Sequence, residues 1–155
     1  MPMPDVNVLV YAHREDEAWH EPYATWLKQV IDGPEPFALS VLVAVGFLRI
    51  VTSGRIYEDP TPLPAALAAM EQLVAHPRCR LATPGTTHLG DVIRLCRAVG
   101  ATSKLVSDAQ HAALAIAEGA TWVSRDRDFA RFEGHGLRWQ HLAFEQAGGG
   151  PELRA

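Results

Sequence analysis

Four aspartates occupy positions where their carboxylates could meet and hold a metal ion. Asp5 precedes the first apolar segment, Asp108 begins a predicted helix, and Asp126 and Asp128 follow a later apolar segment. In an open parallel sheet, sites form where strand ends meet the following loops and helices. Carboxylates gathered there repel one another, and a hard cation such as Mg²⁺ relieves that repulsion. Such an ion can activate water and stabilise a phosphodiester under attack, so the set favours metal-assisted hydrolysis.

Most of these residues also have a purely structural interpretation. Asp108 could serve only as a cap or as a favourable charge at a helix N-terminus, and Asp126 and Asp128 could belong to a solvated turn. Asp5 is harder to explain locally, because its neighbouring segment is wholly apolar. His111, three residues after Asp108, could contact phosphate or transfer a proton, or could simply pack. The order of the four aspartates along the chain is therefore more informative than any one of them.

The segments between these acids predict alternating strands and helices. The apolar segment 6–12 is predicted as a strand buried on both faces, with further strands at 36–39, 80–82, 120–124 and 137–139. Helices are predicted at 22–31, 41–51, 65–75, 88–99 and 108–118, with Ser40 and Ser107 as N-caps and Gly100 and Gly119 at C-termini. This alternation is typical of an α/β domain whose mostly parallel sheet has helices on both faces.

The composition indicates one folded domain in a reducing compartment. The chain has 155 residues, of which 48% are hydrophobic and 21% charged, and we expect residues 1–145 to form the domain and 146–155 a flexible tail. A net charge of −4 argues against a general nucleic-acid coat but permits local binding of RNA. We see no signal peptide, no membrane span and no Cys-x-x-Cys pair, so we expect a cytoplasmic protein without membrane association.

Three blocks of sequence resemble the PIN-domain nucleases. They are Asp5–Ala12, Ser107–Ala115 and Gly119–Phe129, and Phe47–Thr52 is similar to the second helix of many VapC-type toxins. The resemblance covers residues 4–140, and the combination is specific although no single block is. It implies a three-layer α/β/α fold with a mostly parallel central sheet. It also implies a Mg²⁺-dependent endoribonuclease, with Mn²⁺ as a substitute, that acts as the toxin of a toxin–antitoxin pair and cleaves cellular RNA.

The resemblance also implies roles for individual residues. Asp5 and Asp108 match the metal ligands, and Asp126 matches the third catalytic carboxylate, with Asp128 as the alternative. Ser124 is implied to support Asp126, and Asn7 could hydrogen-bond Asp5 or a water molecule in the site. The basic residues on or beside the three blocks are candidates for binding the RNA backbone: Arg49, Lys104, Arg125 and Arg127.

One position departs from the family pattern. The family usually carries a glutamate in the second helix, and alignment from Ser40 places it at Gly46, in a segment 41–51 without any acid. Weaker metal binding, a substitute ligand or a loss of activity would each follow. The alternative function is therefore a catalytically weak or inactive PIN-fold module that binds RNA or a partner without cutting.

Two other α/β families with clustered aspartates fit the sequence less well. A phospho-acceptor domain normally has two adjacent acids near its first strand, but Asp5 has no acidic neighbour. A haloacid-dehalogenase-like phosphatase begins Asp-x-Asp, whereas this chain reads Asp5-Val6-Asn7.

The resemblance to VapC-type toxins also implies a cognate VapB-like antitoxin as partner. The apolar faces of the predicted helices 41–51 and 65–75 exceed what a small sheet can cover, so we also expect a homodimer.

Overall fold

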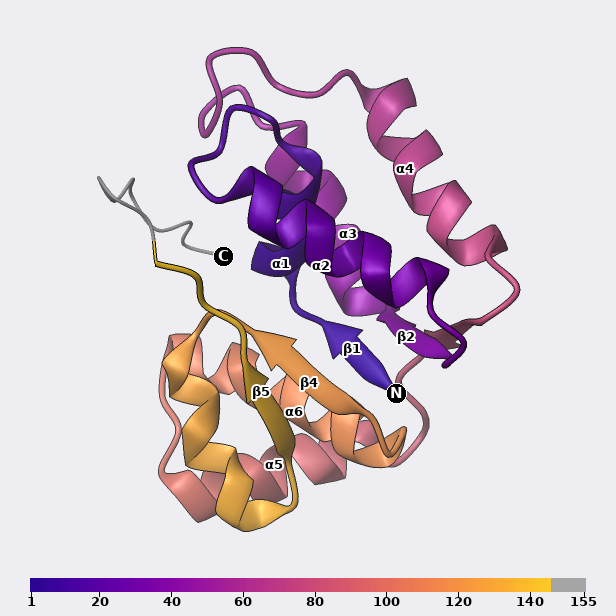
Figure 1. Ribbon diagram of the computed structural model, residues 1–155. Coiled ribbons are helices and arrows are strands. Elements are labelled where there is room, and N and C mark those ends of the chain that lie inside the picture. The colour runs from indigo at the N-terminus through magenta and orange to yellow at the C-terminus, as the bar shows by residue number, and fades with distance from the viewer. Residues whose placement is uncertain (146–155) are drawn as a thin grey trace.

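In the computed structural model, which describes residues 1–145, short parallel strands lie between two groups of helices (Figure 1). β1 (Pro2–Pro4) pairs with β4 (Thr121–Ser124), and β4 pairs with β5 (Arg138–His141). β2 (Phe37–Ser40) pairs with β3 (Cys79–Ala82) as a second ladder, and β1 lies beside β2. The expected three-layer α/β/α fold with a parallel sheet is confirmed.

The helices separate into two groups along the chain. Those of the N-terminal half are α1 (Val6–His13), α2 (His20–Asp32), α3 (Val41–Val51) and α4 (Leu63–Ala75), shown in indigo to magenta in Figure 1. Those of the C-terminal half are α5 (His88–Val99), α6 (Lys104–Ala117) and the 3-10 helix η1 (Arg127–His135). The two groups lie on opposite sides of the strands, so residues at the strand ends can face both (Figure 1).

The segment predicted as the first strand is a helix. Residues 6–12 belong to α1, and the strand is the short segment β1 that precedes them. An unbroken apolar run suits a helix buried on all sides as well as a buried strand, and periodicity alone does not distinguish the two. Asp5 caps this helix, because its side chain accepts a hydrogen bond of 2.6 Å from the amide of Val6. Asp5 therefore lies at the carboxyl end of β1.

The helix predicted to begin at Asp108 begins one turn earlier, at Lys104. Ser107 is therefore a residue inside α6 and not its N-cap; that position belongs to Ser103, which has a φ of 56° and makes no capping hydrogen bond. The earlier start places Lys104 and Asp108 four residues apart on the same face of one helix.

Other element boundaries agree closely with the sequence prediction. α3 spans the predicted residues 41–51, and the hydroxyl oxygen of Ser40 accepts hydrogen bonds from the amides of Leu42 and Val43 at 3.2 and 3.4 Å. Gly100 and Gly119 end α5 and α6 with φ angles of 65° and 63°.

Burial of α3 is less complete than its apolar sequence suggests. Val43 and Phe47 are buried, but the side chain of Val45 is 66% exposed. Among the described residues, no helix combines the length and apolarity needed to cross a bilayer. The predicted tail, 146–155, lies outside the described residues.

Candidate metal centre

An acidic cleft of about 1240 Å³ opens at the carboxyl ends of β1 and β4. Its walls come from α1, α3, α6 and the start of η1. Nine of the residues assigned from sequence line it: Asp5, Asn7, Arg49, Lys104, Asp108, Arg125, Asp126, Arg127 and Asp128. The tenth, Ser124, is fully buried and hydrogen-bonds Asp5, which directly follows β1. The fold thus brings together segments separated by more than a hundred residues.

Ser124 joins the ends of the two central strands. Its hydroxyl donates a hydrogen bond of 2.6 Å to Oδ2 of Asp5 and accepts one of 3.0 Å from the amide of Asp126. The side-chain amide of Asn7 reaches both Asp5 and Ser124 at 3.4 Å. These contacts hold Asp5 at a defined place on the cleft wall. They also align the turn that carries Asp126 and Asp128.

Burial raises the pKa of Asp5 to about 6. The hydrogen bonds from Ser124 and Val6 oppose this rise, while the charges of Asp108 and Asp126 add to it. Asp5 is only 6% exposed, so little water is available to solvate its negative charge. A cation in the cleft would favour its ionised form.

Three carboxylates form the tightest candidate set for a cation. One oxygen from each of Asp108, Asp126 and Asp128 lies within 4.8 Å of the others. Burial raises the pKa of Asp108, and its two acidic neighbours raise it further, although Lys104 opposes them. Asp5 lines the same cleft but does not belong to this set, so the geometry gives Asp128 a more central place than the sequence did. Oxygen donors of this kind suit a hard cation such as Mg²⁺.

Lys104 lies among the three carboxylates. Its ammonium group donates to Asp108 at 3.1 Å, forms an ion pair with Asp126, and lies 3.8 Å from Asp128. Burial lowers the pKa of Lys104, but Asp126 and Asp108 outweigh that effect and raise the pKa to about 12. The sequence had suggested only RNA binding for this lysine. Its spacing from Asp108 would have revealed the pair had the start of α6 been placed correctly.

Comparison with known proteins identifies the family. The model of the PIN domain matches residues 3–134. The chain belongs to the PIN-domain family. It is 41% identical over 137 residues to ribonuclease VapC43 of Mycobacterium tuberculosis, covering 88% of this chain and 92% of that one. It is 39% identical over 128 residues to ribonuclease VapC31 of the same organism, covering 83% and 90%.

Two solved structures share the fold at lower identity. VapBC2 from Rickettsia felis, bound to a promoter DNA fragment, aligns with a TM-score of 0.64 at 18% identity and covers 90% of this chain and 96% of that chain. VapC20 of Mycobacterium tuberculosis, described as a toxin that cleaves the sarcin–ricin loop, aligns with a TM-score of 0.62 at 14% identity, covering 89% and 98%. These likenesses support the PIN architecture described above.

In this PIN domain, position 46 faces the cleft. Gly46 lines the cleft wall opposite α1, and a Cβ atom placed on it would lie 3.0 Å from Cγ2 of Val6. That distance is tighter than ordinary van der Waals contact. A larger residue at position 46 would therefore require a shift of the Val6 side chain.

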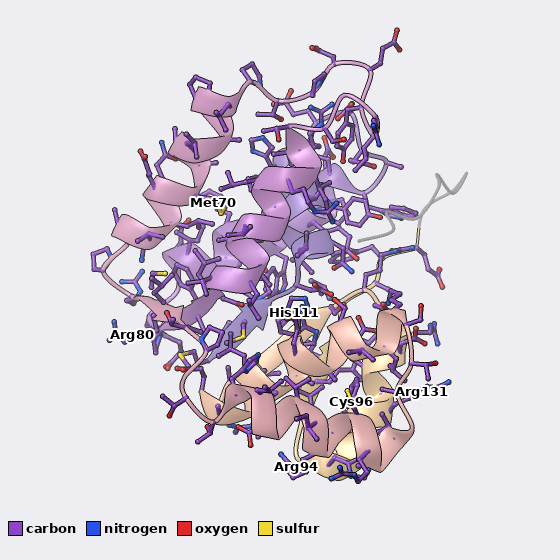
Figure 2. All side chains as sticks on the ribbon, turned by 180° about the vertical axis from the view of Figure 1, so that it is seen from behind. Met70, Arg80, Arg94, Cys96, His111 and Arg131 are labelled. Carbon is purple, nitrogen blue, oxygen red and sulfur yellow. The ribbon has the colours of Figure 1, made fainter. Side chains whose placement is uncertain are left out.

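Two histidines also contribute to the wall of the PIN-domain cleft. His111 stacks on Trp122, with ring centroids 5.1 Å apart and an interplanar angle of 18°, and Figure 2 shows it where α6 faces the N-terminal half. Burial lowers its pKa to about 4, so the ring is neutral at neutral pH and the packing interpretation of His111 is favoured. No sequence signal pointed to His141, whose Nε2 lies 2.9 Å from the carbonyl oxygen of Arg125.

The arginines of the cleft differ in their surroundings. Arg49 on α3 and Arg127 on η1 have exposed side chains on the cleft rim. Arg125 lies with its guanidinium group 3.8 Å above the ring of Trp19, which is 4% exposed. The first two are therefore the better placed to meet a large ligand.

Proposed function

We propose that this PIN domain is a Mg²⁺-dependent endoribonuclease, with Mn²⁺ as a substitute, and the toxin of a toxin–antitoxin pair. The observation that carries the proposal is the cluster of Asp108, Asp126 and Asp128 beside Asp5 in one open cleft. The names of the VapC relatives support RNA as the substrate and a phosphodiester as the bond that is hydrolysed.

The acidic residues of the cleft would act as the ligands of the ion. Asp5 and Asp108 would bind it directly, with Asp126 as the third carboxylate and Asp128 as the alternative to Asp126. The ion, when bound, supplies an activated water and neutralises charge on the phosphodiester. Ser124 orients the carboxylate of Asp5 and the backbone of Asp126 through its two hydrogen bonds. Such supporting contacts typically matter tenfold to a hundredfold for metal affinity or activity.

The RNA backbone would be held at the rim of the cleft. Arg49 and Arg127 lie on different elements that border the acids, and their exposure leaves the guanidinium groups accessible to phosphate. Arg125 and Lys104 would act closer to the centre, where they also offset the repulsion between the phosphates and the carboxylates. Phosphate contacts of this kind position a nucleic acid without selecting its sequence.

A second, apolar groove supports a protein partner. It encloses about 300 Å³ between α1, α2, α3 and α4, and is lined by side chains that include Leu9, Leu27, Phe47, Met70 and Leu73. We propose that a segment of a VapB-like antitoxin binds there, and that two copies of the chain form a homodimer. The solved VapBC2 assembly, which shares this fold, supports such a partner.

The alternative is a binding module that does not cut. Two observations favour it: position 46 lacks a carboxylate, and Lys104 already neutralises part of the acidic cluster. Such a protein would bind RNA or the partner through the same surfaces, without turnover.

One experiment distinguishes these functions and tests the site. Structured RNA is incubated with the purified protein in Mg²⁺ or EDTA, using wild type, D5N, D108N and the control D32N. Asp32 and Lys28 form an exposed ion pair on α2 and do not line the cleft, so D32N removes one negative charge outside it. We expect Mg²⁺-dependent cleavage by wild type and D32N, and at least about a hundredfold loss in D5N and D108N, with metal binding lost and folding retained. Cleavage at the wild-type rate by D5N would refute the site assignment, and RNA binding without cleavage by any form would favour the alternative.

A further inference from the structure

The ammonium group of Lys104 lies where a cation would be expected. Nζ contacts Oδ2 of Asp108 at 3.1 Å and Oδ1 of the same residue at 3.4 Å, and it forms ion pairs with Oδ2 of Asp126 and Asp128. These are the same three side chains whose oxygens converge as the candidate metal ligands. A carboxylate oxygen that accepts a hydrogen bond from an ammonium group is less available to a metal ion.

The arrangement is more than a helix-surface ion pair. Lys28 and Asp32 have the same four-residue spacing on α2, but both side chains are largely exposed, at 76% and 59%. Lys104, the first residue of α6, also pairs with Asp126, which directly precedes η1, and with Asp128, which lies in η1. Its partner Asp108 is only 9% exposed at the side chain, so water screens this pair much less.

We propose that Lys104 is a resident counter-ion of the acidic cluster, which a divalent cation must displace, so that this lysine weakens metal binding. The inference rests on the metal site of the proposed function. It follows from competition for the same oxygens and from repulsion, because an ammonium group and a divalent cation a few ångströms apart destabilise each other. The side chain is 48% exposed and flexible, so it can leave the carboxylates for solvent without disturbing α6.

Calorimetric titration of Mn²⁺ into metal-free protein tests this inference. K104M removes the charge but keeps most of the length of the side chain, and K104R keeps the charge. K28M is the matched control, because it removes the lysine of the exposed pair on α2. We expect K104M to bind Mn²⁺ roughly tenfold more tightly than wild type, while K104R and K28M bind within about twofold of it.

A thermal measurement provides a second readout. Without metal, K104M should melt at a lower temperature than wild type, because three carboxylates are left without their counter-ion. Saturating Mn²⁺ should raise its melting temperature by more than it raises that of wild type. If K104M does not fold, K104Q replaces it as the neutral variant.

The outcomes separate this inference from the proposed function. Equal or weaker Mn²⁺ binding by K104M, with clear binding by wild type, would overturn the role of Lys104 and leave the metal site intact. Absence of Mn²⁺ binding by every form, including K104M, would overturn the metal site and this inference together.

Discussion

Asp5 is the residue in which burial opposes most directly the charge that the proposed function requires. Its carboxyl group is buried and hydrogen-bonded to Ser124, and its pKa rises from the usual 3.8 to about 6. Between these two values the folded protein holds a proton that the unfolded chain has released. The free energy of unfolding of the metal-free protein therefore decreases as the pH rises through this window, and the contribution of Asp5 is fully present only below it.

Replacement by asparagine should remove this pH dependence. Relative to D5N, wild type in EDTA should lose about 2–3 kcal/mol of stability between about pH 4 and pH 7. The measurement is urea unfolding of both proteins across that range. Saturating Mn²⁺ should reverse the trend in wild type, because the ion favours the ionised carboxylate. Parallel pH profiles for the two proteins in EDTA would show that the burial of Asp5 does not shift its titration.

At the scale of elements, α3 presents its glycine to the acidic cleft. Gly46 lies between the exposed Val45 and the buried Phe47, and it lines the wall opposite Val6 of α1. A carboxylate there would restore the acid that the family usually carries in this helix. The space for it is occupied, because an added Cβ atom would lie 3.0 Å from a methyl group of Val6.

A double substitution tests whether α3 can supply the missing ligand. V6A makes room, and G46E/V6A should bind Mn²⁺ roughly ten- to a hundredfold more tightly than G46A/V6A, which has the same backbone and space without the charge. Calorimetry provides both dissociation constants. Equal binding by the two variants would mean that a carboxylate at position 46 does not reach the metal.

At the scale of the whole molecule, apolar surface remains after the domain has folded. Leu63, Leu67 and Val74 on α4 are all exposed, at 56%, 39% and 47%, and none of them lines the acidic cleft. Several exposed apolar side chains on one helix are typical of an interface. The expected homodimer would cover α4 and leave the acidic cleft open to RNA.

Light scattering across a wide concentration range tests the assembly. We expect wild type to be a dimer. The substitution L63E, at the start of α4, should shift the monomer–dimer equilibrium toward monomer. L89E is the matched control, because Leu89 is near the start of α5 and is 69% exposed on the other half of the molecule. A monomer at every wild-type concentration would contradict the homodimer, and equal dissociation by L89E would place the interface elsewhere.

Much of the architecture and the membership of the cleft could be predicted from the chain alone. The bounds of α3, its Ser40 cap and the glycines that end α5 and α6 follow from local signals, which act within a few residues. The family resemblance and the acids at strand ends also predicted which side chains would line one site. These features are local in sequence or are set by the alternation of strands and helices.

Only the tertiary structure decided how those side chains interact. Whether segment 6–12 is a helix or a strand depended on what surrounds it, because an apolar run satisfies either when it is buried. The pKa of Asp5 depends on its hydrogen bond with Ser124, which lies 119 positions away in the sequence. The ion pair of Lys104 with Asp126 joins residues that are 22 positions apart. Burial and electrostatic coupling act through space, so no local pattern in the sequence could determine them.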